Sequence, residues 1–182
     1  MVLTLFIVTF LSSSAVGLVY ESTKERIEEA KINKKVKALK NVLPDFDNNP
    51  MNDAYCIEGS SGNLMFYPAI KDGQRIGTAI ETFSQEGFGG DIKLLVGYLP
   101  DGTIHNIAIL EQQETPGLGD KISPKKSNFL QQFMNKNPRT FRLLVTKDGG
   151  AVDGITAATI SSRAFCDAVQ RSYTYLQKDS QS

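Results

Sequence analysis

Several residue types are scarce in this chain, and each scarcity excludes a class of site. The 182 residues include one histidine, two cysteines and no tryptophan. With His105 alone, the chain has too few histidines for a histidine metal site and lacks the residue pattern of a Ser-His-Asp hydrolase. Cys56 and Cys166 are too few and too far apart in sequence for an iron–sulfur or zinc site. We therefore expect no metal site and no catalytic residue, and we expect His105 to lie at the surface.

An excess of charge of either sign is also missing. The chain has 20 basic and 20 acidic residues, so its formal net charge at pH 7 is zero. The basic residues do not cluster with interleaved aromatic residues, which argues against a nucleic-acid partner. Hydrophobic residues make up 41% of the chain, enough for a sizeable core, and the length fits one domain with appendages.

Residues 1–20 carry no charged side chain and are mostly apolar. At about 1.5 Å per residue, a helix of this length reaches about 30 Å, the thickness of the hydrocarbon core of a bilayer. Ala15-Val16-Gly17 would also suit cleavage of a signal peptide. However, no positively charged segment precedes the apolar run, and the run continues beyond Gly17. We predict that residues 1–20 form a retained transmembrane anchor.

Residues 21–52 are predicted to form a charged helical stalk, which Pro44 ends, and then a polar loop. Apolar residues are sparse in this stretch, so we expect it to be solvated. Lys24 and Arg26 follow the anchor but are offset by neighbouring glutamates. The positive-inside rule therefore decides little about the side of the membrane on which the remaining chain lies.

Residues 53–178 are predicted to form an α+β domain, with an antiparallel sheet and helices packed against one of its faces. Lys71-Asp72-Gly73 and Pro100-Asp101-Gly102 each lie between two apolar runs, a pattern typical of β-hairpins. Residues 54–57 are expected to be a short edge strand. A flexible loop with three glycines, residues 86–90, connects the two hairpins.

The second half of this domain is predicted to contain two helices and one further strand. Residues 123–134 are expected to be helical, with their aromatic residues on one side. Leu143-Leu144-Val145 is expected to be a short strand, followed by a turn at Asp148-Gly149-Gly150. From Thr159 onward, mostly apolar residues recur at helical spacing, so a helix is predicted there.

The most informative stretch of the chain is Asp153-Gly154-Ile155-Thr156-Ala157-Ala158-Thr159, at the start of that last helix. Asp153 or Thr156 can cap the helix, which leaves backbone N–H groups free in its first turn. Such a helix end favours negative charge, so a phosphate on Thr159 would be well placed. The small residues allow a bulky group to approach. An ordinary helix cap would use the same residue types.

A second stretch, Glu114-Thr115-Pro116-Gly117-Leu118-Gly119-Asp120, follows a predicted strand. Pro116 fixes one backbone angle, while Gly117 and Gly119 permit conformations that other residues avoid. The loop is therefore expected to have a defined shape and exposed amides, able to approach a flat ring closely. A simple strand-to-helix turn rich in glycine is the alternative interpretation.

Taken together, the two stretches resemble the FMN-binding domain that is found in the G subunit of the Rnf electron-transport complex and in the related C subunit of the sodium-translocating NADH:quinone oxidoreductase. The resemblance implies that FMN is attached covalently to Thr159 through a phosphoester bond. It also implies that a flavin transferase of the ApbE type, using FAD and magnesium, recognises Asp153, Thr156 and Ala158. Ala157 departs from the family, which often has glycine there.

The resemblance extends to the second stretch and to the glycine loop at residues 86–90. Glu114 and Thr115 are expected to make polar contacts to the flavin. The expected shape of the pocket comes from Gly117, Leu118 and Gly119. The glycine loop is similar to one in the FMN-binding domain and would line the same cleft.

The function that the resemblance implies is electron transfer. The chain would be a redox subunit, incomplete as a catalyst alone, between ferredoxin and NAD in the Rnf complex, whose other subunits couple electron flow to ion movement. Its domain would lie on the extracytoplasmic side of the cytoplasmic membrane. Two alternatives are the C subunit of the quinone reductase and a standalone membrane-tethered or secreted flavoprotein shuttle.

The two cysteines remain open between two states. Outside the cytoplasm, Cys56 and Cys166 would be able to form a disulfide that closes a large loop. Cys166 also lies on a partly apolar helix, where a buried free thiol is expected, and we favour the free thiol.

Overall fold

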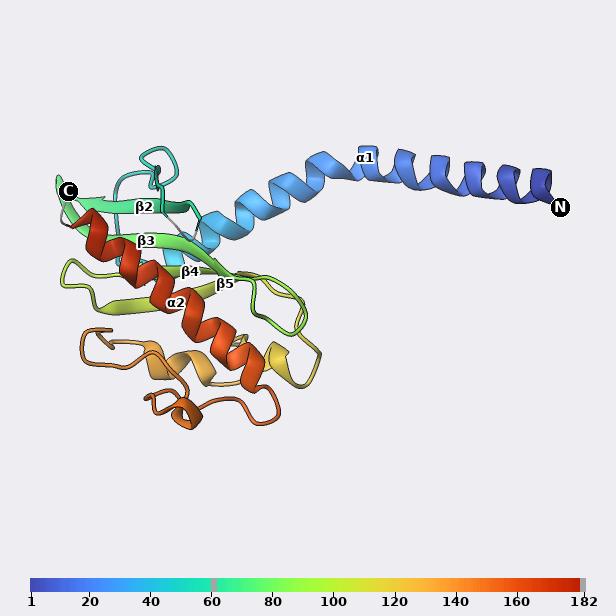
Figure 1. The fold of residues 1–182 in the computed structure, drawn as a ribbon. Coiled ribbons are helices and arrows are strands. Elements are labelled where there is room, and N and C mark those ends of the chain that lie inside the picture. Colours follow the sequence, from blue (N-terminus) through green and yellow to red (C-terminus); the bar gives the residue numbers. More distant parts are fainter. Residues whose placement is uncertain (60–61, 181–182) are drawn as a thin grey trace. The chain divides into compact units, whose positions relative to one another are not determined.

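The computed structural model of the chain describes residues 1–59 and 62–180. Its main elements are an N-terminal helix α1 (Val2–Val42), an antiparallel sheet of five strands and a C-terminal helix α2 (Thr159–Asp179), as Figure 1 shows. The predicted α+β class, with an apolar helix ahead of a sheet and packed helix, is confirmed. Contacts divide the chain into two compact units, Met1–Val36 and Lys37–Ser182.

Helix α1 contains an 18-residue window with a mean hydropathy of 2.2, long and apolar enough to cross a membrane. None of its side chains up to Val36 is buried. The helix ends at Val42, two residues before Pro44, as expected from the missing N–H of proline. The boundaries given above for anchor, stalk and domain remain predictions.

The sheet is a meander in which every strand pairs with its neighbour in the sequence. Both predicted hairpins and the edge strand are confirmed. In the first hairpin, Asp72 and Gly73 have φ angles of 50° and 76°, the left-handed values that a two-residue hairpin turn requires. The strands are β1 (Tyr55–Ile57), β2 (Leu64–Lys71), β3 (Gln74–Ser84), β4 (Ile92–Tyr98) and β5 (Ile104–Glu111).

Helix α2 packs against one face of the sheet and closes the main core. Its partners include Tyr98, whose buried hydroxyl shares a hydrogen bond of 2.7 Å with Ser172. Thr82 of β3 donates to the carbonyl of Ala168 at 2.9 Å. These buried polar contacts fix the position of α2 on the sheet, and so also the position of its first residue.

The other face of the sheet is covered too, so the prediction of helices on one face was wrong. Leu39, Val42 and Leu43 are buried there, in a second core cluster with residues of β2, β3 and β4. Gly97 lets the C-terminal end of α1 approach β4, because a Cβ at this position would lie 1.8 Å from the carbonyl oxygen of Val42. The strands carry apolar residues on both faces, and the end of α1 covers the second.

His105 illustrates this second contact. It is half-buried rather than fully at the surface, because its Nδ1 lies 3.1 Å from the carbonyl oxygen of Val42. The neighbouring Asn106 donates from Nδ2 to the carbonyl oxygen of Asn41 at 3.0 Å. These side chains occupy carbonyl groups that the end of a helix otherwise leaves without partners.

Between β5 and α2 the described chain has little regular structure: three short 3-10 helices, η1 (Gly119–Ile122), η2 (Phe129–Phe133) and η3 (Thr146–Asp148). The helix predicted at residues 123–134 was therefore mostly wrong. The Ser127 hydroxyl donates to the Lys121 carbonyl and accepts from the Phe129 N–H, replacing helical bonds with turn bonds.

The strand predicted at Leu143–Val145 was also wrong. Val145 makes a single isolated bridge to Val152, because the chain turns back immediately through the left-handed Gly149. Leu143 and Val145 are nevertheless buried, whereas Leu144 is exposed. Burial alternates along these three residues as it does in a strand, but apart from the one bridge no strand of the described chain pairs with them.

The two cysteines are free thiols, Cys56 exposed and Cys166 buried. Burial raises the pKa of the Cys166 thiol to about 12. The free thiol favoured above is therefore the state observed, and the disulfide is not formed.

Candidate functional site

The first motif meets the sheet-packed helix at Thr159, which is the first residue of α2. Neither Asp153 nor Thr156 caps the helix, so that prediction was wrong: the N-cap residue is Ala158, without a side-chain cap. Asp153 is exposed, and its backbone N–H and carbonyl instead pair with the side-chain amide of Gln132. The motif is therefore fixed by groups outside the expected cap.

Ser162, one turn into α2, makes two hydrogen bonds that hold the first motif against the start of the helix. Its hydroxyl accepts a hydrogen bond from the Ile155 N–H and donates one to the Ala158 carbonyl, each at 2.9 Å. The Ala158 N–H donates to the Ile155 carbonyl at 3.0 Å. Ser162 is buried, so these hydrogen bonds are shielded from water.

Ala157 adopts a φ angle of 63°, in the left-handed region. A side chain with a Cβ carries a steric cost there that glycine avoids. This is the position at which the resembled motif often has glycine. The departure therefore has a physical consequence, because Ala157 adopts a left-handed conformation that is strained for a residue with a Cβ.

Thr159 is half-buried and borders two hollows of similar size. The first, here called the apolar hollow, has a volume of about 330 Å³; the second, the lysine hollow, has about 320 Å³. The apolar hollow is lined by Phe88, Glu114, Thr115, Leu118, Gly119, Ala157, Ala158, Thr159, Ile160 and Ser161. The lysine hollow is lined by Val145, Thr146, Lys147, Gly154, Ile155, Thr156, Ala157 and Thr159.

Glu114 joins three segments at the back of the apolar hollow. It is buried, and one carboxylate oxygen accepts from the Gly89 N–H at 3.0 Å. The other oxygen accepts from the hydroxyl of Ser161 on α2. Gly119 packs against this pair, since a Cβ there would lie 2.4 Å from both Glu114 Oε2 and Ser161 Oγ. The glycine loop, the second motif and α2 are thus held together by one carboxylate.

The second motif keeps its shape through Asp120. One carboxylate oxygen of Asp120 accepts from the Gly117 N–H at 2.8 Å, and the other lies 3.9 Å from Lys126 Nζ. Gly117 has a φ angle of 79°, which suits glycine. The Leu118 N–H closes the turn on the Thr115 carbonyl at 3.1 Å. The motif has the defined shape that its residue types predicted, but the expectation of exposed amides was wrong for Gly117 and Leu118, whose N–H groups donate within the turn.

Comparison with known proteins agrees with this geometry. Residues 87–174 match the family of FMN-binding domains, a range that includes all but the first residue of the glycine loop, both motifs and most of α2. Over 190 aligned residues the chain is 35% identical to the G subunit of the ion-translocating oxidoreductase complex of Vibrio cholerae serotype O1 (strain M66-2), covering 98% of this chain and 90% of that protein. The proteins of the same name from Photorhabdus laumondii and Shewanella amazonensis are each 34% identical, over 96% and 91% of this chain and 88% and 82% of theirs.

The chain belongs to the G-subunit family of ion-translocating oxidoreductase complexes. Its FMN-binding domain brings together most of the site residues that the sequence predicted for this family. Thr159, Ala158, Glu114, Thr115, Leu118 and Gly119 line the apolar hollow, and Thr156 lines the lysine hollow. Asp153 and Gly117 line neither of the two.

Sequence reasoning missed four residues that organise the site of this family member: Ser161, Ser162, Asp120 and Lys147. The two serines carry no local signal beyond helical spacing, because their partners lie up to 47 residues away in the chain. Asp120 ends the second motif, and its residue type alone does not indicate that its carboxylate holds the turn. Lys147, whose Nζ lies 3.4 Å from the Thr159 hydroxyl oxygen, had no signal in the sequence.

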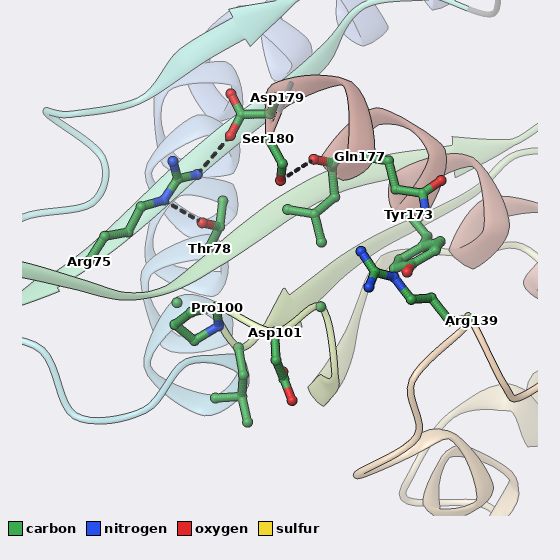
Figure 2. A pocket seen from close by; sticks show the side chains of 13 residues that line it. Arg75, Thr78, Pro100, Asp101, Arg139, Tyr173, Gln177, Asp179 and Ser180 are labelled. Carbon is green, nitrogen blue, oxygen red and sulfur yellow. Dashed lines mark hydrogen bonds and ion pairs between the residues drawn. The ribbon is translucent and has the colours of Figure 1, made fainter. Parts of the chain in front are cut away.

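A further hollow of about 410 Å³ lies at the opposite end of α2, about 30 Å from Thr159 by helix length. Figure 2 shows that Arg75 points toward Asp179 and Thr78 there, and the Arg75–Asp179 ion pair measures 3.1 Å. The other charged lining residues are Arg139 and Asp101, so the lining charges cancel. No residue of either motif lines it.

Proposed function

We propose that the chain is the electron-carrying subunit of an Rnf-type complex, a membrane-bound ion-translocating ferredoxin:NAD oxidoreductase. In this proposal the carrier is FMN, esterified through its phosphate to Thr159. Two findings support it: the match to FMN-binding domains and the similarity to proteins named as the G subunit of an ion-translocating oxidoreductase complex. The other subunits of such a complex are the proposed partners.

The observation that carries the assignment to Thr159 is the position of its hydroxyl. The hydroxyl lies at the first residue of α2, between two hollows, and is only half-buried. The first backbone N–H groups of a helix have no acceptor within the helix, and they favour an anion. A phosphate on this oxygen would therefore be stabilised where it forms, while the attached group has room on either side.

The attachment itself is proposed to need a flavin transferase of the ApbE type with FAD and magnesium. The Thr159 oxygen forms a bond to the phosphorus of the FMN half of FAD. The pyrophosphate bond breaks, AMP leaves, and the hydroxyl proton passes to a base of the transferase. Thr156 and Ala158, which line the two hollows, and the exposed Asp153 are the proposed recognition residues. When bound, the flavin supplies the redox chemistry, and the protein supplies its position and surroundings.

The apolar hollow is the proposed place of the flavin ring. Its rim carries three exposed apolar side chains: Phe88 (69% exposed), Ile160 (49%) and Leu118 (41%). A flat aromatic ring would remove part of this surface from water, which is favourable by about 25 cal/mol per Å². Thr115 is proposed to make a polar contact to the ring, and Glu114 to hold the hollow in shape through Gly89 and Ser161.

Helix α1 is the proposed single-pass anchor in the cytoplasmic membrane, with the FMN-binding domain on the extracytoplasmic side. The apolar window of α1 supports the anchor. A covalent bond would keep the cofactor where a dissociated one would be lost, so the location and the ester support each other.

Two other functions would use the same site. The C subunit of the sodium-translocating quinone reductase is one, and a standalone flavoprotein shuttle is the other. The names of the relatives favour the Rnf-type assignment over both. Purification from the native membrane separates a complex from the shuttle: co-elution with integral-membrane subunits supports a complex, and a single soluble flavoprotein supports the shuttle.

Intact-mass and peptide mass spectrometry of the chain from its native membrane test the attachment. We expect an FMN-sized increment on the peptide that contains Thr159, and its loss in Thr159→Ala. Thr146→Ala is the matched control, because it removes a hydroxyl from the lysine hollow without touching Thr159. A colourless, unmodified native chain, or a Thr159→Ala variant with the full increment, would overturn the proposal.

A further inference from the structure

The charges around Thr159 are distributed unevenly between the two hollows. Among the described residues that line them, Glu114 is the one acidic side chain and Lys147 the one basic side chain. Glu114 is buried in the apolar hollow, and its oxygens accept hydrogen bonds from Gly89 and Ser161. Lys147 is exposed in the lysine hollow, and its ammonium lies 3.4 Å from the Thr159 hydroxyl oxygen.

The position of Lys147 is set by the next residue. Asp148 accepts two hydrogen bonds of 2.7 Å from Arg163, which lies one turn beyond Thr159 on α2. Residues four apart on a helix share a face, so this fork attaches η3 to the side of α2 that carries Thr159. Gly149 ends η3 in the left-handed conformation. Lys147 is therefore presented to the Thr159 oxygen by a bidentate ion pair beside it.

The same ion pair occupies Arg163. Its guanidinium makes both hydrogen bonds to Asp148, whereas Lys147 interacts with that carboxylate through its charge alone and donates its hydrogen bond to Thr159. A phosphodiester on this oxygen would carry one negative charge. It would meet a cation in the lysine hollow and a carboxylate in the apolar hollow, so the two hollows differ in the sign of charge that they offer.

We infer that Lys147 is the cation that pairs with the phosphate esterified to Thr159. The phosphate then lies on the side of the lysine hollow and the ring on the side of Phe88, so polarity orients the cofactor. This inference rests on the proposed function. Lys147 is a positioning and charge-pairing residue here, and its ammonium also stabilises the charge that develops on the Thr159 oxygen as the ester forms.

The test uses the full-length chain in detergent, loaded by the transferase with FAD and magnesium. The ³¹P resonance of the ester is followed from about pH 8 to about pH 11, where lysine side chains lose their protons. A phosphodiester keeps its single charge over this range, so an inflection reports another titrating group, and the part that is lost in a Lys147 variant belongs to Lys147. We expect an inflection in the wild type and in the control Lys125→Met, which removes an exposed lysine that lines neither hollow.

Two variants of Lys147 should both lose the inflection and differ in the resonance at pH 8. Lys147→Arg should keep the wild-type resonance at pH 8 and lose the inflection, because arginine retains its charge. Lys147→Met should lose the inflection and shift the resonance at pH 8. Attachment of FMN to Lys147→Met should also be about tenfold slower than to Lys147→Arg or Lys125→Met, the effect of losing one hydrogen bond to a charged group.

The outcomes separate the two proposals. An unchanged inflection in Lys147→Met would overturn the inference. If Lys147→Met accepts no flavin while Lys147→Arg does, the charge is required for attachment, which supports it. If both fail although circular dichroism shows them folded, charge is not the relevant property and the inference is wrong. A wild-type chain that accepts no flavin at Thr159 would instead sink the proposed function, before any variant is made.

Discussion

The sheet at residues 55–111 and the segment at residues 112–158 are held by different kinds of interaction. The sheet relies on backbone ladders between neighbouring strands. The segment has short 3-10 helices and one isolated bridge, and side chains such as Asp120 and Ser127 accept its backbone N–H groups. Most of the candidate site lies in the second region, and Thr159 follows it directly at the start of α2. The sheet thus supplies stability, while individual polar side chains shape the site.

The largest effect is expected from a substitution that destabilises the sheet and leaves the site residues unchanged. Phe66 of β2 is fully buried in the main core. Phe66→Ala should lower the free energy of unfolding by about 3–5 kcal/mol, because it removes contacts and leaves a cavity. Urea denaturation measures this loss. The amount of FMN attached per folded molecule should stay at the wild-type value, and a parallel fall in attachment would show that the two regions are not separable.

A smaller effect is expected from a clash within the site. Gly119→Ala places a methyl group 2.4 Å from Glu114 Oε2 and Ser161 Oγ, so the junction of three segments must shift. We expect a loss of about 1–3 kcal/mol in stability together with slower FMN attachment. Gly154→Ala is the matched control for stability, since its added Cβ would meet atoms at ordinary distances of 3.6 Å and more. Equal stability losses in the two variants would contradict the role given to the junction.

The strain at Ala157 predicts a gain in stability. Ala157→Gly removes the steric cost of a Cβ at a φ angle of 63° and should stabilise the folded chain by up to about 1 kcal/mol. The greater freedom of glycine in the unfolded chain offsets part of this gain. Thermal unfolding of the unmodified chain measures it. Lower stability in Ala157→Gly would mean that the turn is not strained.

The smallest effect concerns one carboxyl group in each region. Hydrogen bonds hold the pKa of Asp148, through Arg163, and that of Asp101, through Thr103, below the usual range. A lowered folded-state pKa contributes stability that is present above about pH 4 and lost as the pH falls through the folded value. Asp148→Asn and Asp101→Asn should each lower the melting temperature by on the order of 1 °C at neutral pH. The difference from the wild type should vanish in acid, and a difference that grows in acid would refute the assignment.

The same division decides what the sequence predicts well. The residues Asp72-Gly73 and Asp101-Gly102 predict both hairpins, because glycine and aspartate suit the backbone conformation that such turns need. The periodicity of α2 predicts its existence, and the two motifs predict Thr159 and most of the hollow around it. These features depend on local residue types. The hairpins and α2 are confirmed, and the role of Thr159 stays a prediction.

Most of the failures depend on partners far away in the sequence. The contact between Glu114 and Ser161 spans 47 residues, and no local pattern reports it. The caps expected from Asp153 and Thr156 fail because Ser162 already satisfies the turn from within the helix. The second covered face of the sheet was missed for the same reason, since Val42 meets Gly97 across a long stretch of chain.

The two free thiols have a practical consequence for electrochemistry. No disulfide joins Cys56 and Cys166, so a strong chemical reductant has no disulfide between them to reduce. A flavin titrated to its fully reduced form would therefore report its own electrons alone. The potential of an FMN attached as proposed would then be measurable in dithionite without a second redox couple from the protein.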